Sequence, residues 1–505
     1  MLQDNEIERE NVKVKFEEAL EKASFGIFHY FLILISGVLM VSLFYELMSV
    51  NFSLPVAECD LNITSKSQYG LVSGSWFAGV ILTSHMWGLL SDLYGRRRIL
   101  TVTPIVAFLT SVLSSFSINF WMLAIFRFFN GICVASAGAV VFAYLGEFLT
   151  IRHRSRSIMI ASTIFSLLSV LLPLIAFLVI NQTWKFELPI INFIYKPWRL
   201  FVLICGIPNL ICGIAVYFLP ESPKFVFSKG DIKQTIEILT KVYKINTRKS
   251  DFNITHIEPD DDYQQTSNKS GLFRMMLQNT SQILKNYSLS FWLISIIQFG
   301  TFYVGHGMLL FFPDILHEVS QFDGNENLQL CDIVKSVIEH KNHQLANATT
   351  RVCVDQLDNS AYIYVMILQA CYTFGFIIIS LSVNFIGRLS IFIFLFFTTG
   401  VCGTLIFYMK NAMFATYLYL WMLVSGVASN LMNTVTYDSF PTHLRSMAIS
   451  TTMLFGRLGG LAGGNVASFL LEDNCNWTFS VGGLLLIICG ALIFFIPVIN
   501  KRNVN

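Results

Sequence analysis

Charged residues are scarce in this sequence: only 13% of its 505 residues are Asp, Glu, Lys or Arg, whereas 54% are hydrophobic. A soluble globular protein could not bury so much apolar surface, so that class is excluded. The formal net charge of +2 is too small for a nucleic-acid-binding protein, and the basic residues are scattered between apolar segments. The composition therefore indicates a membrane protein that crosses the bilayer many times.

Recognisable catalytic and cofactor-binding patterns are also lacking. No Cys or His cluster has the spacing of a zinc site, and no nucleophile–base set or phosphate-binding loop is present. We therefore expect neither an enzyme nor a bound metal or cofactor. Residues 1–25 mix acids and bases without an apolar core or a small-residue cleavage site. They are typical of a cytoplasmic tail and not of a cleaved signal peptide.

Apolar runs long enough to cross about 30 Å of hydrocarbon fall into two sets of six. They predict an all-α membrane protein with twelve transmembrane helices in two pseudo-symmetric six-helix bundles. The segment between the sets is rich in Lys, Asp, Ser and Asn, so we expect a linker with short surface helices. The expected organisation is a tail at 1–27, a first bundle at 28–219, a linker at 220–290, a second bundle at 291–498 with a long loop at 313–360, and a tail at 499–505.

Basic residues and glycosylation sequons predict which side each loop faces. The arginines and lysines fall in alternate loops, which predicts that these loops and both termini are cytoplasmic. Four N-x-S/T sequons in the opposite loops are expected to carry glycans: Asn62, Asn181, Asn347 and Asn476. Cys331 and Cys353 share the longest outer loop, where an oxidising compartment would allow a disulfide between them; two free thiols are the alternative.

Two charged patterns occur twice along the chain. The stretch Gly88–Arg98 places Asp92 and three arginines between apolar runs, and a weaker copy, Asn384–Arg388, follows about 290 residues later. An acid precedes an arginine by seven positions at Glu147–Arg154 and again at Asp438–Arg445. Duplication indicates two similar halves, and acid–arginine pairs at helix ends predict a cytoplasmic gate; the alternative is that these charges only fix topology. The predicted gate residues are Gly88, Asp92, Gly95, Arg96, Arg97, Glu147, Arg154, Gly387, Arg388, Asp438 and Arg445.

Ionisable residues inside the apolar runs are the best candidates for a substrate or coupling site, because charge within a membrane is costly and usually functional. Glu46 and Arg127 are expected at similar depths on the first and fourth helices, where they could pair; otherwise each reaches a membrane interface. His306 could titrate or simply be satisfied by a neighbour. Arg457, near the midplane, needs an acid, a carbonyl or an anionic ligand. Asn430 and Asn433 supply further polar groups.

The Gly88–Arg98 loop resembles the signature loop of the major facilitator superfamily. Several further segments resemble the branch that contains synaptic vesicle glycoprotein 2 and its insect relatives, near the sugar and organic-ion transporters: Gly26–Tyr30, Leu54–Leu61, Ser84–Gly88, Phe440–Arg445 and Gly456–Gly459. The resemblance implies a monomeric transporter of a small organic solute in the plasma membrane or a vesicle membrane. It would work by alternating access, with or without coupling to protons or another cation. The alternative is a non-transporting vesicle protein that retains the scaffold.

Overall fold

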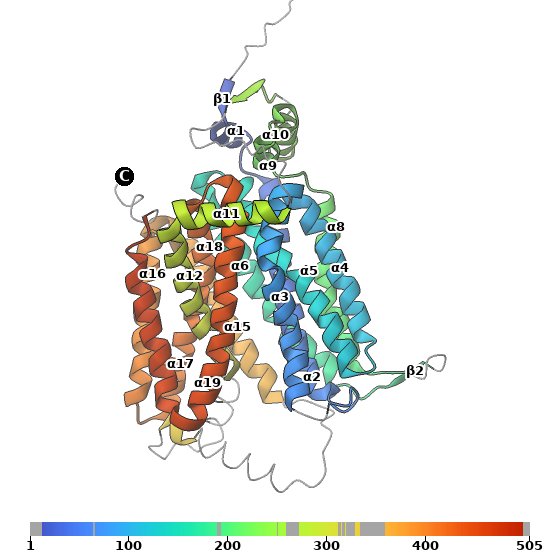
Figure 1. The fold of residues 1–505 in the computed structure, drawn as a ribbon, viewed down its shortest axis with the longest axis vertical. Coiled ribbons are helices and arrows are strands. Elements are labelled where there is room, and N and C mark those ends of the chain that lie inside the picture. The colour runs from blue at the N-terminus through green and yellow to red at the C-terminus, as the bar shows by residue number, and fades with distance from the viewer. Residues whose placement is uncertain are drawn as a thin grey trace, which may run out of the picture.

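The protein is seen in a computed structural model, which describes residues 13–63, 66–188, 193–249, 251–258, 272–311, 315, 319, 329–333 and 359–497. Within these residues, eleven helices are long and apolar enough to cross a membrane. A further helix, α3 (Lys66–Tyr94), has 29 residues and packs in the same bundle against α5. At about 1.5 Å per residue it is also long enough to span. The long helices stand side by side in two groups (Figure 1).

The first bundle contains the helices from α2 to α8. Gly95 has a φ of +99° and turns the chain between α3 and α4, a conformation that favours glycine. The Asn119 side chain caps the start of α5, and Pro197 begins α8. Besides α3, the bounds are α2 (Ile27–Ala57), α4 (Arg96–Ser115), α5 (Phe120–Glu147), α6 (Ile151–Ser169), α7 (Leu171–Ile180) and α8 (Pro197–Tyr217).

The second bundle is more irregular, because short π and 3-10 segments interrupt its helices. A π segment, η1 (Tyr303–Gly307), continues α12 (Ser288–Phe302), and the chain departs from helical geometry at Asn474 inside α19. The other bounds are η2 (Met308–Phe311), α15 (Asn359–Ile386), α16 (Arg388–Leu405), η3 (Ile406–Tyr408), α17 (Ala412–Leu423), η4 (Val424–Val427), α18 (Ala428–Ser439) and α19 (Thr442–Ile493).

The expected surface helices of the linker lie together at one end of the molecule, here called the linker end. The helix α11 runs across the tops of the long helices (Figure 1). The strand β1 near the N-terminus pairs in parallel with β4 of the linker, so the N-terminal segment is tied to the linker. The bounds are β1 (Lys13–Lys15), α1 (Phe16–Lys22), α9 (Pro223–Ser228), α10 (Ile232–Thr247), β4 (His256–Glu258) and α11 (Leu272–Asn286). Elsewhere, β2 (Phe186–Leu188) and β3 (Phe193–Tyr195) form a hairpin.

The disulfide prediction was wrong: Cys331 is bonded to Cys475 and not to Cys353. Cys475 directly follows the break at Asn474, so the turn between the two halves of α19 brings it to Cys331. The two bonded cysteines are 144 positions apart, and their pairing follows from how the helices pack and not from a shared loop. Cys59 is also disulfide-bonded, and Cys353 lies outside the described residues. We call this end the disulfide end.

The bundles meet along two seams. One seam packs α6 and α7 against α15, and the other packs α3 against α19. In the first seam the hydroxyls of Ser166 and Thr373 are 3.0 Å apart, and Tyr362 donates a hydrogen bond to Asn181 (3.1 Å). Breaking these polar contacts between the bundles costs little free energy, because each hydroxyl can exchange its partner for water or for another polar group. These seams are therefore the surfaces on which the bundles could move.

Candidate functional site

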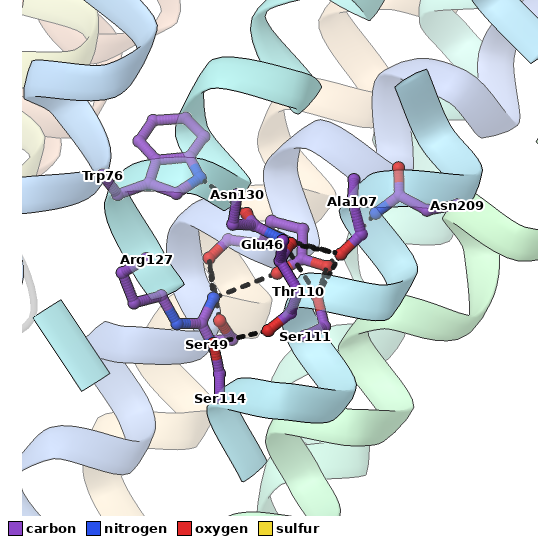
Figure 2. Close-up of polar contacts among 10 residues, drawn as sticks. All are labelled: Glu46, Ser49, Trp76, Ala107, Thr110, Ser111, Ser114, Arg127, Asn130 and Asn209. Carbon is purple, nitrogen blue, oxygen red and sulfur yellow. Dashed lines mark hydrogen bonds and ion pairs between the residues drawn. The ribbon is translucent and has the colours of Figure 1, made fainter. Parts of the chain in front are cut away.

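The structure brings Glu46 and Arg127 together inside the first bundle. An oxygen of the Glu46 carboxylate accepts a hydrogen bond from the Arg127 guanidinium at 3.0 Å, and both side chains are fully buried. Glu46 comes from α2 and Arg127 from α5, and the two side chains point toward one another (Figure 2). Two buried charges need such a partner, because an isolated ion in hydrocarbon is far more costly.

Three further polar side chains complete the surroundings of the Glu46 carboxylate. Ser111 of α4 donates its hydroxyl proton to the carboxylate, and Asn209 of α8 donates from its amide at 3.1 Å. Asn130 lies one turn from Arg127, accepts a hydrogen bond from Trp76 (3.1 Å) and donates to Ser111 (3.0 Å). Side chains from α4, α5 and α8 therefore donate to one carboxylate on α2 (Figure 2), and each donor stabilises its ionised form.

Arg127 is less completely satisfied than Glu46. Its Nε and one of its Nη atoms are buried and have no hydrogen-bond partner among the described residues. Orphaned buried donors are uncommon and each costs about 1–3 kcal/mol. A change in the protonation or hydration of this pair would therefore alter the free energy of this region by a large amount.

The second bundle holds a hydrogen-bonded pair of amide side chains, of which the sequence analysis predicted Asn433 and missed Gln298. Gln298 of α12 donates to the side-chain oxygen of Asn433 of α18 at 3.1 Å. The remaining amide atoms, Oε1 of Gln298 and Nδ2 of Asn433, are buried without partners in the described part of the chain. Asn430 is also buried. The signal for Gln298 was available, since a glutamine between isoleucine and phenylalanine within an apolar run is costly unless used.

Arg457 of α19 crosses from the second bundle to the first. Its guanidinium hydrogen-bonds the Ser84 hydroxyl of α3, and it belongs to no ion pair among the described residues. A Cβ on Gly138 of α5 would lie 2.8 Å from a guanidinium nitrogen, so the glycine makes room for Arg457. The position of Arg457 along its apolar run predicted a site near the midplane, where it would need an acid, a carbonyl or an anionic ligand. In the structure its partner is a serine hydroxyl.

His306 is separated from the Glu46–Arg127 pair, since it lies in η1 of the second bundle. Its ring stacks on Phe302 with centroids 4.3 Å apart, and the side chain is exposed. No hydrogen bond to the imidazole is found within the described residues. Phe302 in turn packs with Tyr437, Ile449 and Met453 in a small apolar cluster.

At the linker end, the predicted gate residues form two charged clusters. In the first, the Arg96 guanidinium contacts Asp92 (2.6 Å) and Glu147 (3.1 Å), joining the ends of α3, α4 and α5. Glu221, which sequence analysis missed, accepts hydrogen bonds from the backbone N–H groups of Arg96 and Arg97, both at 3.0 Å. It binds the start of α4, where a carboxylate is favoured by the helix dipole. Gly88 lies one turn before Asp92 on α3.

The second charged cluster joins the two bundles. Asp438 of α18 accepts hydrogen bonds from Arg154 of α6 and from Arg388 of α16, each at 2.9 Å, so one carboxylate serves both halves. The arginines of the repeated pattern, Arg154 and Arg445, both lie over the Tyr437 ring, at 4.4 and 3.8 Å from its centroid. Gly387 precedes Arg388 with a φ of +83°.

The two copies of the repeated pattern are used differently. Asp438 pairs across the bundle interface with Arg154, whereas Glu147 pairs within its own bundle with Arg96. Arg445 donates from Nε to the Tyr437 carbonyl at 2.8 Å, and its Nη1 is buried without a partner in the described part of the molecule. At the linker end the bundles are therefore joined by the Arg154–Asp438 ion pair and by stacking of Arg154 on Tyr437.

Lys224, in α9, is a second linker-end residue that sequence analysis did not single out. Burial and the nearby Arg445 and Arg154 guanidinium groups lower the pKa of Lys224 to about 8. Burial also raises the pKa of Glu221 above its usual value. Both directions reflect the cost of charge in a crowded, poorly hydrated environment.

The predicted glycosylation sites lie at or near the disulfide end. Asn62 is exposed and has a φ of +54°, whereas Asn181 and Asn476 are partly buried. Asn347 lies outside the described residues. Within those residues, no group of three His, Cys, Asp or Glu side chains is placed to hold a metal ion.

Comparisons with known proteins agree with this architecture. The human synaptic vesicle glycoprotein 2B is 24% identical over 331 residues, which cover 61% of this chain and 48% of the relative. The rat synaptic vesicle glycoprotein 2A is 24% identical over 63% of this chain and 45% of its own length. The matches thus span about half the length of these relatives.

Solved structures show the same fold at low sequence identity. The proton:xylose symporter XylE bound to 6-bromo-6-deoxy-D-glucose superposes with a TM-score of 0.66 and 14% identity, over 93% of this chain and 96% of the symporter. An inward-open structure of XylE from E. coli gives a TM-score of 0.58 over 93% of this chain and 95% of that one. The Major Facilitator Superfamily model matches residues 27–334, more than half of the chain. The chain therefore belongs to the Major Facilitator Superfamily, a family of multi-pass membrane transporters and not of enzymes.

Proposed function

We propose that this protein is a secondary transporter that moves a small organic solute by alternating access, with a proton or another cation coupled through Glu46. The observation that carries the proposal is the fully buried Glu46–Arg127 pair, in which two guanidinium nitrogens lack hydrogen-bond partners among the described residues. A merely structural pair would gain from satisfying them. A pair that must open and close during a cycle benefits from being incompletely satisfied.

Protonation of Glu46 removes the negative charge that holds Arg127. Arg127 is then a buried cation without a counter-ion, which is unfavourable until the bundle rearranges or an anion arrives. A conformational change on protonation follows from this imbalance, and a transmembrane proton gradient supplies its free energy. The amides of Gln298 and Asn433 offer one free acceptor and one free donor for a polar solute.

The gate in this proposal is the linker end. The Arg154–Asp438 pair and the Tyr437 stack tie the bundles together there, so this end is closed. Opening it requires the pair to separate, and Asp438 keeps Arg388 as a partner when it does. The cost of opening is thereby reduced, which suits a gate that must cycle.

We place the linker end and both termini in the cytoplasm, with the protein a monomer in the plasma membrane or a vesicle membrane. The glycans on Asn62, Asn181, Asn347 and Asn476 then face the other side. An endoglycosidase shift that disappears when these asparagines are replaced by glutamine supports this orientation. Modification of a cysteine placed at exposed Lys241 of α10 by an impermeant reagent outside intact cells contradicts it.

Uptake by purified protein in liposomes tests the function. The panel comprises organic cations, organic anions and sugars, each with and without a proton gradient. A saturable uptake that a gradient accelerates, and that Glu46→Gln uncouples, supports the proposal. Folded protein that transports nothing from the panel supports the alternative, a vesicle membrane protein that retains the transporter scaffold.

A further inference from the structure

Arg457 differs from the arginines that form ion pairs in the bundles. The guanidinium groups of Arg96, Arg127, Arg154 and Arg388 each contact a carboxylate, whereas that of Arg457 contacts only a serine hydroxyl among the described residues. A hydroxyl oxygen has no net charge and neutralises nothing. The cation therefore has no counter-charge among the described residues, although it lies within a candidate membrane span, where an uncompensated charge is costly.

The Arg457 side chain is only partly buried, whereas that of Arg127 is fully buried. Only one of the Arg457 nitrogens has a hydrogen-bond partner within the described part of the chain, and none of them belongs to the fully buried, unpartnered atoms. In Arg127, by contrast, the nitrogens that lack a hydrogen-bond partner among the described residues are fully buried. Arg457 thus keeps N–H donors that no described residue accepts, at a position that side chains of both bundles contact.

The surroundings of Arg457 come from both bundles. Ser84 lies on α3 and Gly138 on α5 of the first bundle, while Arg457 itself lies on α19 of the second. Ser84 is fully buried, and its own proton goes to the carbonyl of Val80. An occupant that accepts hydrogen bonds from Arg457 competes directly with Ser84 and so acts on a contact that links the bundles.

We infer that the transported solute carries an anionic group, such as a carboxylate or a sulfonate, and that Arg457 binds it. This inference rests on the proposed transport function and names its substrate class. A planar anion can accept two parallel N–H bonds from a guanidinium, which a hydroxyl cannot match. Binding supplies the missing counter-charge and releases Ser84, so occupancy loosens the seam between α3 and α19.

Ligand-induced thermal stabilisation of the purified full-length protein tests the inference without requiring transport. The probes are three molecules with one aromatic skeleton: benzoate, neutral benzamide and cationic benzylamine. A ligand that binds the folded state raises the unfolding temperature with its concentration. We expect benzoate to stabilise the wild-type protein, and Arg457→Gln to weaken that binding by about tenfold or more.

Three variants make the outcome specific. Arg457→Lys keeps the charge without the planar fork and should retain part of the binding. Ser84→Ala removes the competitor and should tighten benzoate binding, an effect that a general loss of stability cannot mimic. Arg248→Gln removes a charge from the exposed residue that directly follows α10 and should leave binding unchanged.

Stabilisation by benzylamine or benzamide but not by benzoate overturns the inference, as does benzoate binding that Arg457→Gln leaves intact. The absence of stabilisation by benzoate, sulfate and methanesulfonate at tens of millimolar overturns it as well. Benzoate binding that depends on Arg457, together with no flux in liposomes, upholds the anion site and refutes the transport function. The two failures are therefore distinguishable.

Discussion

The two bundles treat buried charge in opposite ways. The first bundle neutralises its charges internally, with Glu46 against Arg127 and Glu147 against Arg96. The second bundle shares its charged side chains with the first: Asp438 binds Arg154 of the first bundle as well as its own Arg388, and Arg457 binds Ser84. The Glu46–Arg127 pair is thus contained within one bundle, whereas the Asp438 and Arg457 contacts cross between bundles and must change if the bundles move. The predictions below test this difference, beginning with the largest expected effect.

Glu46→Gln tests the self-contained pair. It should lower the free energy of unfolding by about 3–5 kcal/mol, because it leaves Arg127 buried without a counter-charge. Thermal unfolding in detergent measures the loss. The double variant Glu46→Gln/Arg127→Gln should recover much of the stability, since no charge is then left unpaired. A single variant as stable as the wild-type protein contradicts the importance of this pair.

Cys331→Ser/Cys475→Ser tests the tie at the disulfide end. Removing the bond should cost about 2–4 kcal/mol, because the unfolded chain regains the freedom of a long loop. Reductant should destabilise the wild-type protein more than this variant, in which the disulfide of Cys59 remains to be reduced. Peptide mapping under non-reducing conditions should find Cys331 joined to Cys475; a Cys331–Cys353 peptide contradicts the structure.

Asp438→Asn and Arg154→Gln test the charges that cross between bundles. Asp438→Asn should open the linker end more than Arg154→Gln, because Asp438 serves two arginines and Arg154 leaves Arg388 in place. Each lost charge-assisted bond is worth about 1.5–3 kcal/mol. Distances between spin labels at the ends of α6 and α18 report opening. Equal effects of the two variants, or none, contradict the shared-carboxylate arrangement.

The pH dependence of linker-end closure gives the smallest expected effect. The pKa of Lys224 is lowered to about 8 in the closed structure by burial and by Arg445 and Arg154, while Glu17 and Glu147 oppose this shift. If opening hydrates Lys224 and restores the usual pKa of 10.5, the open state binds more protons, chiefly between about pH 8 and 10.5. Closure should therefore strengthen as the pH rises through this window. Lys224→Met should flatten the dependence in the same spin-label measurement; an unchanged slope contradicts it.

The sequence predicted the parts of this protein that local composition controls. Apolar runs predicted the helices and the two bundles, and depth along those runs placed Glu46 and Arg127 at one level, where the structure pairs them. A signature loop predicted the family. Each of these features depends on neighbours in sequence or on helix geometry alone.

Contacts between distant segments could not be predicted in the same way. The partner of Cys331 depends on where the break at Asn474 points, and the partner of Arg457 lies 373 positions away on α3. The role of Glu221 as a cap for α4 arises only when α9 folds back on the bundle. Such pairings follow from tertiary packing, which residue spacing does not encode.

The division of roles between Glu46 and Arg457 is tested most directly by comparing exchange with gradient-driven accumulation in proteoliposomes, with the solute found in the uptake panel. Glu46→Gln should exchange solute across the membrane but fail to accumulate it when a proton gradient is imposed. Arg457→Gln should lose both activities, because it cannot bind the solute. Exchange at the wild-type rate by Arg457→Gln, or gradient-driven accumulation by Glu46→Gln, would contradict that division.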